Sequence, residues 1–148
     1  MNPVDIEYGY QIWQKHTNQI VGYNKRFIVM TKNEKLKYSD WGSMPRLIIT
    51  GIAFLSKSLC ESYYSQNKEN LDFVQKVNNC EDILMNFVAV KNYDLPGIYV
   101  KRKYNHLRSR GISSKQKSHL NTRSNCLNFF FKSFGKLPLP ITNDSLYY

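Results

Sequence analysis

The chain has 148 residues and a formal net charge of +10, and 42% of its residues are hydrophobic and 14% aromatic. This length and composition predict one globular domain and exclude a disordered chain. No stretch reaches the ~20 apolar residues of a membrane-spanning helix. The first ten residues contain Asp5 and Glu7 instead of an apolar run, so we expect neither a signal peptide nor a transmembrane segment in this sequence.

The positive charge is concentrated toward the end of the chain. Between Leu95 and Asn143 there is no Asp or Glu. The basic residues of this segment are Lys101, Arg102, Lys103, Arg108, Arg110, Lys115, Lys117, Arg123, Lys132 and Lys136. A field of one sign favours anionic partners such as nucleic acid, phosphate esters or acidic polysaccharides. A solvated basic surface without a partner is the alternative.

The first part of the chain predicts a helix followed by strands. Hydrophobic spacing indicates a helix over residues 4–16, with Asp5 as its N-cap. Residues 19–30 predict one strand or two, interrupted near Asn24. Residues 31–45 are polar and predict a loop or a weak hairpin.

The middle of the chain predicts a buried strand and then helices. Residues 46–56 form a continuous apolar run rich in β-branched residues, which is typical of a strand buried on both faces. Gly51 inside it indicates a bulge or the close approach of another backbone or a ligand. Helical patterns follow over residues 56–66, capped by Ser56 or Ser58, and over residues 71–93, with a break at Asn78-Asn79.

The last part predicts a short strand, a loop and a helix. Residues 95–103 indicate a turn and a strand, and residues 104–122 a long polar loop, a length that is usually functional or mobile. Residues 122–135 predict a helix that Gly135 terminates, followed by an irregular tail. The order of these elements predicts an α/β fold with a mixed sheet.

The segment Asn78-Asn79-Cys80-Glu81-Asp82 places two carboxylates directly ahead of an apolar helical run. Its simplest role is structural: an asparagine caps the helix and the acidic residues complement its positive end, each worth about 0.3–1 kcal/mol. The alternative is a site in which a carboxylate faces a bound sugar or a metal. Arg123 would then be the counter-charge, or a bidentate clamp for phosphate oxygens.

Cysteine spacing gives little evidence for a metal. Cys60, Cys80 and Cys126 lack the C-x-x-C spacing of zinc sites. An odd count allows one disulfide with one free thiol, or three thiols. The residues alone do not decide between these states.

Four blocks together resemble the exostosin family of glycosyltransferases, grouped as family 64. In chain order they are WQKHTNQIVGYNKR, IITGIAF, NCEDILMNF and TRSNCLNFFFKSFGKLPL, within a span from about Ile6 to about Asn143. The resemblance implies a GT-A-like fold. Residues 1–148 would cover its C-terminal, acceptor-side part with a mixed sheet and lack the N-terminal nucleotide-binding half.

The family resemblance also implies an activity. Relatives transfer a sugar, an N-acetylhexosamine or glucuronic acid, with retention from a UDP-sugar donor to a glycan or proteoglycan acceptor, usually of the heparan type. The implied cofactor is Mn²⁺, bound by an Asp-x-Asp motif that this sequence does not contain. We therefore expect the metal ligands to lie outside this chain, and expect no metal-binding residue within it.

Matching the family motifs residue by residue implies the catalytic group. Asp82 occupies the position of the active-site carboxylate, and Glu81 the neighbouring acidic position. Arg123 matches an arginine expected near the UDP phosphates. Asn79 and His119 match polar positions that bind substrate.

Two further pairs follow from the same match. Gly51 and Ala53 fall on a strand that lines the sugar pocket in the family, with tight strand packing as the alternative explanation. Cys80 and Cys126 match a disulfide-bonded pair. Cys60 would then be a buried free thiol.

Alternatives to a working transferase remain. One is a non-catalytic remnant that binds acidic glycans or supports a full-length exostosin, possible partners including another exostosin-type subunit. A basic nucleic-acid-binding module is the weakest alternative, because the sequence has no recognition helix, zinc site or aromatic RNA-binding strand, so we expect no nucleic-acid partner.

The family resemblance also implies a location in the Golgi or endoplasmic reticulum lumen and membrane association. The sequon Asn143-Asp144-Ser145 is permissive for glycosylation but weak, because such triplets occur by chance.

Overall fold

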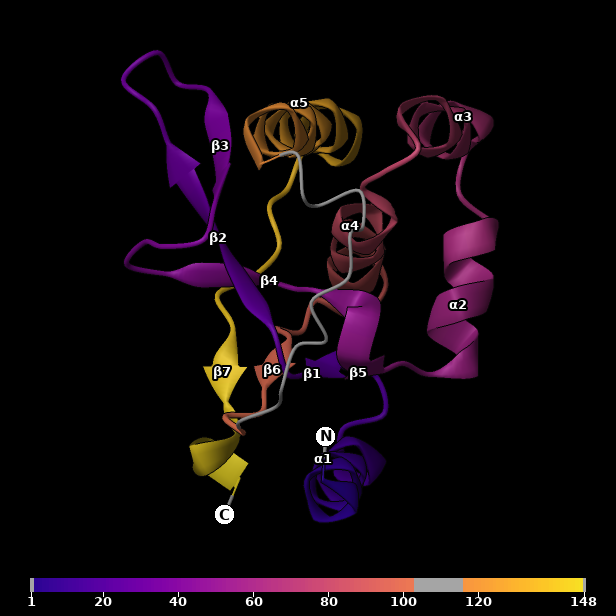
Figure 1. Ribbon diagram of the computed structural model, residues 1–148. Coiled ribbons are helices and arrows are strands. Elements are labelled where there is room, and N and C mark those ends of the chain that lie inside the picture. Colours follow the sequence, from indigo (N-terminus) through magenta and orange to yellow (C-terminus); the bar gives the residue numbers. More distant parts are fainter. Residues whose placement is uncertain (1, 103–115, 148) are drawn as a thin grey trace.

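The computed structural model describes residues 2–102 and 116–147, which form an α/β fold (Figure 1). Its α-helices are α1 (Pro3–Lys15), α2 (Lys57–Tyr64), α3 (Lys68–Val77), α4 (Glu81–Tyr93) and α5 (Gln116–Phe134). Its strands are β1 (Val21–Gly22), β2 (Lys25–Met30), β3 (Leu36–Ser39), β4 (Pro45–Ile48), β5 (Ala53–Phe54), β6 (Ile98–Tyr99) and β7 (Thr142–Asn143). Two short 3-10 turns complete it, η1 (Thr50–Ile52) and η3 (Asp144–Tyr147). None of the described helices is long and apolar enough to span a bilayer.

The strands form two sheets. The four-stranded sheet has the order β5-β1-β6-β7, in which β1 runs antiparallel to β5 and parallel to β6, and β6 runs parallel to β7. The three-stranded sheet, β3-β2-β4, is antiparallel throughout. The predicted mixed sheet is confirmed, and the segment predicted as a loop or weak hairpin contains β3, which pairs with β2.

Each of the two long apolar runs in the first half of the chain contributes one strand to each sheet. Residues 21–30 contribute β1 to the four-stranded sheet and then β2 to the three-stranded one, and the predicted interruption near Asn24 is confirmed. The run at 46–56 was wrongly predicted as one buried strand. It is β4, the turn η1 and β5, because the chain changes sheet at Gly51. The two segments in which the chain passes from one sheet to the other are hydrogen-bonded to each other: the Ile49 N–H donates to the Asn24 carbonyl, 2.9 Å away.

Hydrophobic clusters cover both faces of the four-stranded sheet. Alternate residues of its strands point to opposite faces. Val21 and Ile98 pack with Ile12 of α1, whereas Ile20 and Tyr99 join the larger cluster under α4 and α5. Figure 1 accordingly shows α1 on one side of this sheet and α4 on the other.

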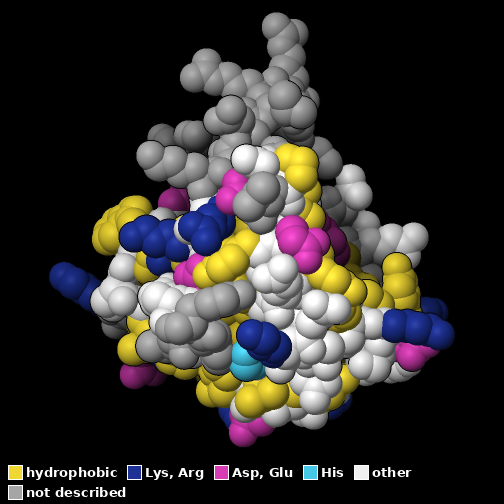
Figure 2. Space-filling view, turned by 90° about the horizontal axis from the view of Figure 1, so that it is seen from below, with side chains coloured by type: hydrophobic (Ala, Val, Ile, Leu, Met, Phe, Trp, Pro, Cys, Tyr) yellow, Lys and Arg dark blue, Asp and Glu magenta, His cyan; other side chains and the backbone are white. Residues whose placement is uncertain are grey.

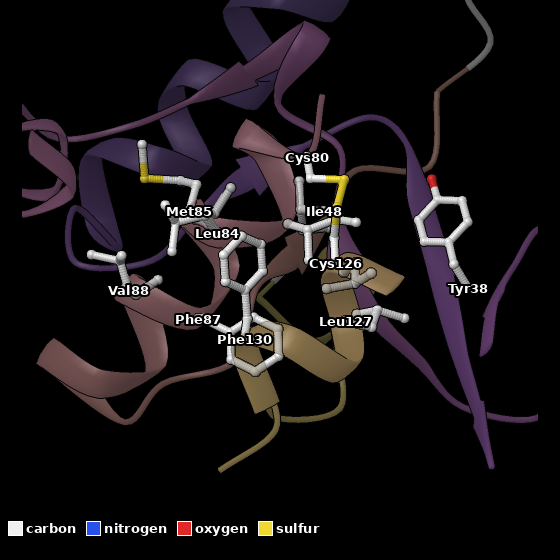
Figure 3. Close-up of a cluster of buried hydrophobic side chains, with 14 of the residues drawn as sticks. Tyr38, Ile48, Cys80, Leu84, Met85, Phe87, Val88, Cys126, Leu127 and Phe130 are labelled. Carbon is white, nitrogen blue, oxygen red and sulfur yellow. A yellow bond between two sulfur atoms is a disulfide. The ribbon is translucent and has the colours of Figure 1, made fainter. Parts of the chain in front are cut away.

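The larger cluster is centred on the helix α4. Every residue of α4 from Asp82 to Val90 is buried, and Phe87 and Phe130 face each other across α4 and α5 with ring centroids 5.9 Å apart (Figure 3). A helix that is apolar on all sides is typical of a core element. Burying one large apolar side chain contributes about 1.5–3 kcal/mol, so α4 is rigidly held by its neighbours.

Two asparagines close the edges of the three-stranded sheet. Asn86 of α4 accepts the Ile48 N–H (3.0 Å) and donates to the Ile48 carbonyl (2.8 Å). Asn128 of α5 does the same for Leu36, at 3.0 and 2.8 Å. In each case the carboxamide takes the place of a neighbouring strand, so the buried edge-facing backbone groups of Ile48 in β4 and Leu36 in β3 are paired.

The helix ends agree with the sequence at most positions. Ser56 caps α2 by accepting the Leu59 N–H, and Asn78 ends α3 in the left-handed conformation at φ 50°. Gly135 follows α5 at φ 70°. The predicted cap of the first helix was wrong: α1 begins at Pro3, and Asp5 lies inside its first turn.

The predicted loop over 104–122 was wrong at its end, because α5 begins at Gln116; residues 103–115 lie outside the described part. The buried side of α5 runs through His119, Arg123, Cys126 and Phe130, at helical spacing. Its first two members are polar, so the segment shows no hydrophobic periodicity although it is a helix.

Candidate active site

The centre of the candidate site is an ion pair between α4 and α5. Arg123 Nη2 lies 2.5 Å from Asp82 Oδ2, and both residues are buried, with exposed fractions of 5% and 3%. The other carboxylate oxygen of Asp82 accepts the N–H of Ile83 at 2.8 Å. Both oxygens of the carboxylate are therefore held by donors, and its position is fixed by the first turn of a buried helix.

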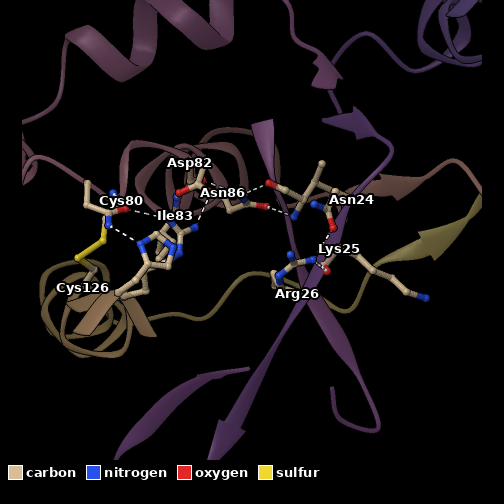
Figure 4. A network of polar contacts seen from close by, with 12 residues as sticks. Asn24, Lys25, Arg26, Cys80, Asp82, Ile83, Asn86 and Cys126 are labelled. Carbon is tan, nitrogen blue, oxygen red and sulfur yellow. Dashed lines mark hydrogen bonds and ion pairs between the residues drawn. A yellow bond between two sulfur atoms is a disulfide. The ribbon is translucent and has the colours of Figure 1, made fainter. Parts of the chain in front are cut away.

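Asn79 connects this pair to His119. Its carbonyl oxygen accepts hydrogen bonds from Arg123 Nη1 (2.9 Å) and from the Cys80 N–H (2.7 Å). Its amide nitrogen lies 3.2 Å from His119 Nδ1, and because an amide nitrogen only donates, the ring nitrogen accepts. Figure 4 shows Asp82 and Ile83 at the start of α4, beside Cys80 and its disulfide partner Cys126 of α5. Asp82, Arg123, Asn79 and His119 thus lie together, as their assignment to one site requires.

The three-stranded sheet supplies residues that the sequence analysis did not identify. The Tyr38 ring lies under the Arg123 guanidinium, 4.5 Å from centroid to Cζ. Arg26 Nε pairs with Asp40 at 2.8 Å, and both charges act on His119. Tyr38 and Asp40 have i, i+2 spacing around a strand end, which places them on one face. That spacing could have grouped Tyr38 with Asp40, but nothing in it identified Arg123 as the residue that packs on Tyr38.

The pKa values in the site reflect burial and neighbouring charge. Burial opposes the charge on Arg123, but the Asp82 carboxylate and the Tyr38 hydroxyl group together outweigh it and raise the guanidinium pKa. Burial and then the Arg123 cation lower the pKa of His119 below its usual 6.5. Burial raises the pKa of Tyr38. At neutral pH the site therefore holds a charged arginine beside a neutral imidazole and a neutral phenol.

A disulfide fixes the two helices beside the site. Cys80, immediately before α4, is bonded to Cys126 of α5, and both are fully buried. This is the pairing that the family resemblance implied. Cys60 is the free cysteine and is half-buried.

The predicted asparagine cap of α4 was wrong. Cys80 holds the N-cap position in a left-handed conformation, φ 76°, and makes no side-chain capping bond. A left-handed backbone is unusual for a residue with a side chain. Asn78 ends α3 and Asn79 faces Arg123, so the asparagines are not used to start the helix.

Three of the predicted residues lie apart from the network. Glu81 is exposed, and together with burial, which is the larger cause, it raises the pKa of Tyr63 to about 12. Gly51 is exposed in η1, and a Cβ there would contact no heavy atom of the described protein within 4 Å, so no other backbone approaches it closely; the approach of a ligand stays a prediction. Ala53 is half-buried in β5. No hydrogen bond or ion pair between described residues links Gly51 or Ala53 to Asp82.

The residues of this site do not fit a Mn²⁺ centre. Among residues 2–102 and 116–147, no three His, Cys, Asp or Glu side chains gather closely enough to hold a metal ion. The Asp82 carboxylate is already occupied by Arg123 and Ile83. A divalent cation bound to Asp82 would also be repelled by the Arg123 guanidinium, whose Nη2 lies 2.5 Å from the carboxylate.

Part of the predicted basic field is neutralised by ion pairs. Arg102, Arg123 and Lys136 pair with Asp5, Asp82 and Asp94, respectively. On the face shown in Figure 2, Lys and Arg side chains lie among Asp and Glu side chains. Four of the basic residues, Lys103, Arg108, Arg110 and Lys115, lie outside the described part.

Comparison with known proteins identifies the family. The profile of the glycosyl transferase family 64 domain matches residues 1–146. Glucosamine inositolphosphorylceramide transferase 1 of Oryza sativa subsp. japonica is 34% identical over 145 residues, and glycosylinositol phosphorylceramide mannosyl transferase 1 of Arabidopsis thaliana 29% over 148. Exostosin-2 of Homo sapiens is 30% identical over 144 residues.

These matches cover 90%, 93% and 93% of this chain, but only 19%, 44% and 20% of those relatives. The chain therefore spans less than half the length of each of them. Within that span the match includes the start of α4 and the whole of α5, which together hold the buried ion pair. The chain belongs to glycosyl transferase family 64.

Proposed function

We propose that this chain is the acceptor-side part of a GT-A-type glycosyltransferase that transfers a sugar from a UDP-sugar to a glycan with retention of configuration. Family membership supports a transferase, and the relatives are named as transferases of glucosamine or mannose groups or as exostosins. An N-acetylhexosamine or glucuronic acid is the proposed sugar. A nucleotide-binding part, in the same polypeptide or a partner subunit, would complete the enzyme.

The single observation that carries this proposal is the buried Asp82–Arg123 pair. In the transfer, the bond between C1 of the sugar and the UDP oxygen breaks, and UDP leaves with the bonding electrons. The acceptor hydroxyl forms the new bond to C1 on the same face and gives its proton to a phosphate oxygen of the leaving UDP. Positive charge develops on the sugar ring, and a fixed carboxylate in dry surroundings stabilises it strongly.

Arg123 has two proposed roles. Its Nη1 and Nη2 groups hold Asn79 and Asp82, so it positions the carboxylate. Its Nε is buried and has no hydrogen-bond partner among the described residues, so its N–H is one of the donors left for a phosphate oxygen. His119, neutral at pH 7, and Asn79 would contact substrate hydroxyl groups.

Two further parts of the proposal come from the family. Mn²⁺ would offset diphosphate charge and would take its ligands from the nucleotide-binding part, because the residues of this site do not fit a metal. The enzyme would act in the Golgi or endoplasmic reticulum lumen. The buried Cys80–Cys126 disulfide supports such an oxidising compartment.

The test measures transfer from radiolabelled UDP-N-acetylglucosamine, UDP-N-acetylgalactosamine and UDP-glucuronic acid to glycan acceptors, with the protein at the length its source produces. Asp82→Asn should lower the transfer rate by about 100-fold or more, the scale expected when one charged group is lost from a transition state. Asn128→Ala is the matched control, because it destabilises a sheet edge and its hydrogen bonds are to Leu36 and Ser124 and not to Asp82 or Arg123.

Equal loss of transfer in both variants would show that Asp82 acts only through stability. Undiminished transfer by a correctly folded Asp82→Asn variant would exclude it as the active carboxylate. Saturable binding of acidic glycans by a protein that transfers none of the three sugars would favour the non-catalytic remnant.

A further inference from the structure

The sequon near the end of the chain has its acceptor residues on the surface. Asn143-Asp144-Ser145 is the only N-x-S/T triplet in the 148 residues. Asn143 and Ser145 are exposed, whereas Asp144 between them is only 8% exposed. The Asp144 carboxylate accepts a hydrogen bond from the Tyr8 hydroxyl of α1 at 3.2 Å. The middle residue therefore anchors the triplet, and the two residues that define the sequon face solvent.

The position of Asn143 leaves room for a large substituent. It ends β7, the last strand of the four-stranded sheet, and is in register with Tyr99 of β6 on one side only. Within the described part of the chain no strand pairs with the outer side of β7, which lies at the border of the fold in Figure 1. A bulky group at Asn143 would cover this open edge, and covered edges resist pairing with other chains.

The backbone at this position is compatible with both the fold and the modification. Thr142 donates its N–H to the Gly97 carbonyl at 3.0 Å, which fixes the strand before the acceptor residue. The chain then turns at once into η3. Glycan acceptors lie in surface segments of this kind in secreted proteins.

We infer that Asn143 is an N-glycosylation site and carries one N-linked oligosaccharide. Its donor is a lipid-pyrophosphate-linked oligosaccharide supplied by the secretory pathway. The carboxamide nitrogen of Asn143 forms a bond to C1 of the first sugar, while the C1–O bond breaks and the lipid pyrophosphate leaves with the electron pair. The amide proton passes to a base of the transferring enzyme.

This inference rests on the compartment given in the proposed function, and not on the catalytic role of Asp82. The Cys80–Cys126 disulfide is the independent indicator of that compartment, because such bonds persist in oxidising environments. Glycosylation and the disulfide should therefore occur in the same molecules.

The test uses the full chain secreted from eukaryotic cells behind a cleavable signal, and the native protein from its source. Intact mass is measured before and after treatment with peptide-N-glycosidase F, and free thiols are counted in the same samples. The expected result is loss of one glycan mass on treatment, with Asn143 converted to aspartate. Asn143→Gln and Ser145→Ala should each abolish the shift, and Ser145→Thr should retain it.

Asn125→Gln is the matched control, because Asn125 is exposed on α5 but has no Ser or Thr two residues later. It should keep the glycan. A disulfide-bonded protein with no mass shift would overturn the Asn143 site while leaving the compartment intact. A native protein with three reduced thiols and no glycan would overturn the compartment and the site together, whereas transfer by the Asp82 centre would be tested separately.

Discussion

Asp82 and Arg123 lie 41 residues apart in the sequence and meet at 2.5 Å between α4 and α5, with side chains only 5% and 6% exposed. A buried pair is costly to break from one side, because the remaining charge has no solvent and no partner. This relationship makes the pair a structural feature as well as a candidate for chemistry, and the two roles can be separated by measurement.

The first prediction concerns this coupling. Asp82→Asn should lower the free energy of unfolding by about 3–5 kcal/mol, because it leaves the buried guanidinium uncompensated. The double variant Asp82→Leu/Arg123→Met should be more stable than Asp82→Leu or Arg123→Met alone, because each single change leaves one buried charge unpaired. Urea denaturation of wild type, these two single variants and the double variant forms a double-mutant cycle that measures the coupling energy, and strictly additive effects would contradict the pair.

The second prediction concerns the sheet edge at Ile48. Asn86→Ala removes both hydrogen bonds to the Ile48 backbone and one to the Asp82 carbonyl, at 2.7 Å. Each buried group left unpaired costs about 1–3 kcal/mol, so a clear fall in the denaturation midpoint is expected. Asn92→Ala, at an exposed position of the same helix, should change it little. Hydrogen exchange at the Ile48 amide should accelerate only in the first variant.

The third prediction concerns the disulfide. The bond between Cys80 and Cys126 closes a loop with a sequence separation of 46. In the chain-entropy model a loop of this length is worth about 4 kcal/mol. The double variant Cys80→Ser/Cys126→Ser should lose stability on this scale by thermal or chemical denaturation. Cys60→Ser, which changes a half-buried free thiol, serves as the control and should stay close to wild type.

The fourth prediction is a pH dependence that originates at His119. Its folded pKa is lowered by burial and then by the Arg123 and Arg26 cations, which together outweigh the opposing effect of the facing Asp82 and Asp40 carboxylates. The unfolded chain therefore binds more protons below the usual pKa of 6.5. The stability from His119 is fully present above that value and is lost as the pH falls toward the folded pKa.

Denaturation midpoints at about pH 7.5 and about pH 5.5 measure this effect, since the two values lie on either side of the unfolded pKa. Wild type should lose more stability between them than His119→Gln does. His16→Gln is the control, because His16 lies in the turn after α1 and away from this network. If the two variants and the wild type respond alike, His119 is not the source.

The fifth prediction contrasts two glycines. At Gly22 a Cβ would lie 2.4 Å from Ile48 Cγ2, so Gly22→Ala should cost about 1–3 kcal/mol through overpacking. At Gly51 a Cβ meets nothing, and Gly51→Ala should stabilise by up to about 1 kcal/mol. The thermal unfolding midpoints of the two variants and the wild type test both predictions. Loss of transfer in a stable Gly51→Ala variant would support the predicted substrate contact at this exposed turn.

The sequence by itself determined most of the helices and the break between α3 and α4, because apolar spacing and cap residues are local signals. It also supplied the family match, and with it the pairing of Cys80 with Cys126. Two of the wrong predictions share one physical reason. The run at 46–56 serves two sheets, and the first turns of α5 bury polar residues, so neither segment shows the periodicity of its real structure.

Only the tertiary structure decided which groups meet. Arg123 could be proposed from the sequence as the counter-charge of a carboxylate at the start of α4, but its burial over Tyr38 and its contact with Asn79 depend on how two helices pack against a sheet. The same holds for Asn86 and Asn128, which in the sequence are ordinary helix residues and in the fold complete two strand edges. Local patterns specify elements, whereas contacts between residues distant in the chain arise when those elements bury a common core.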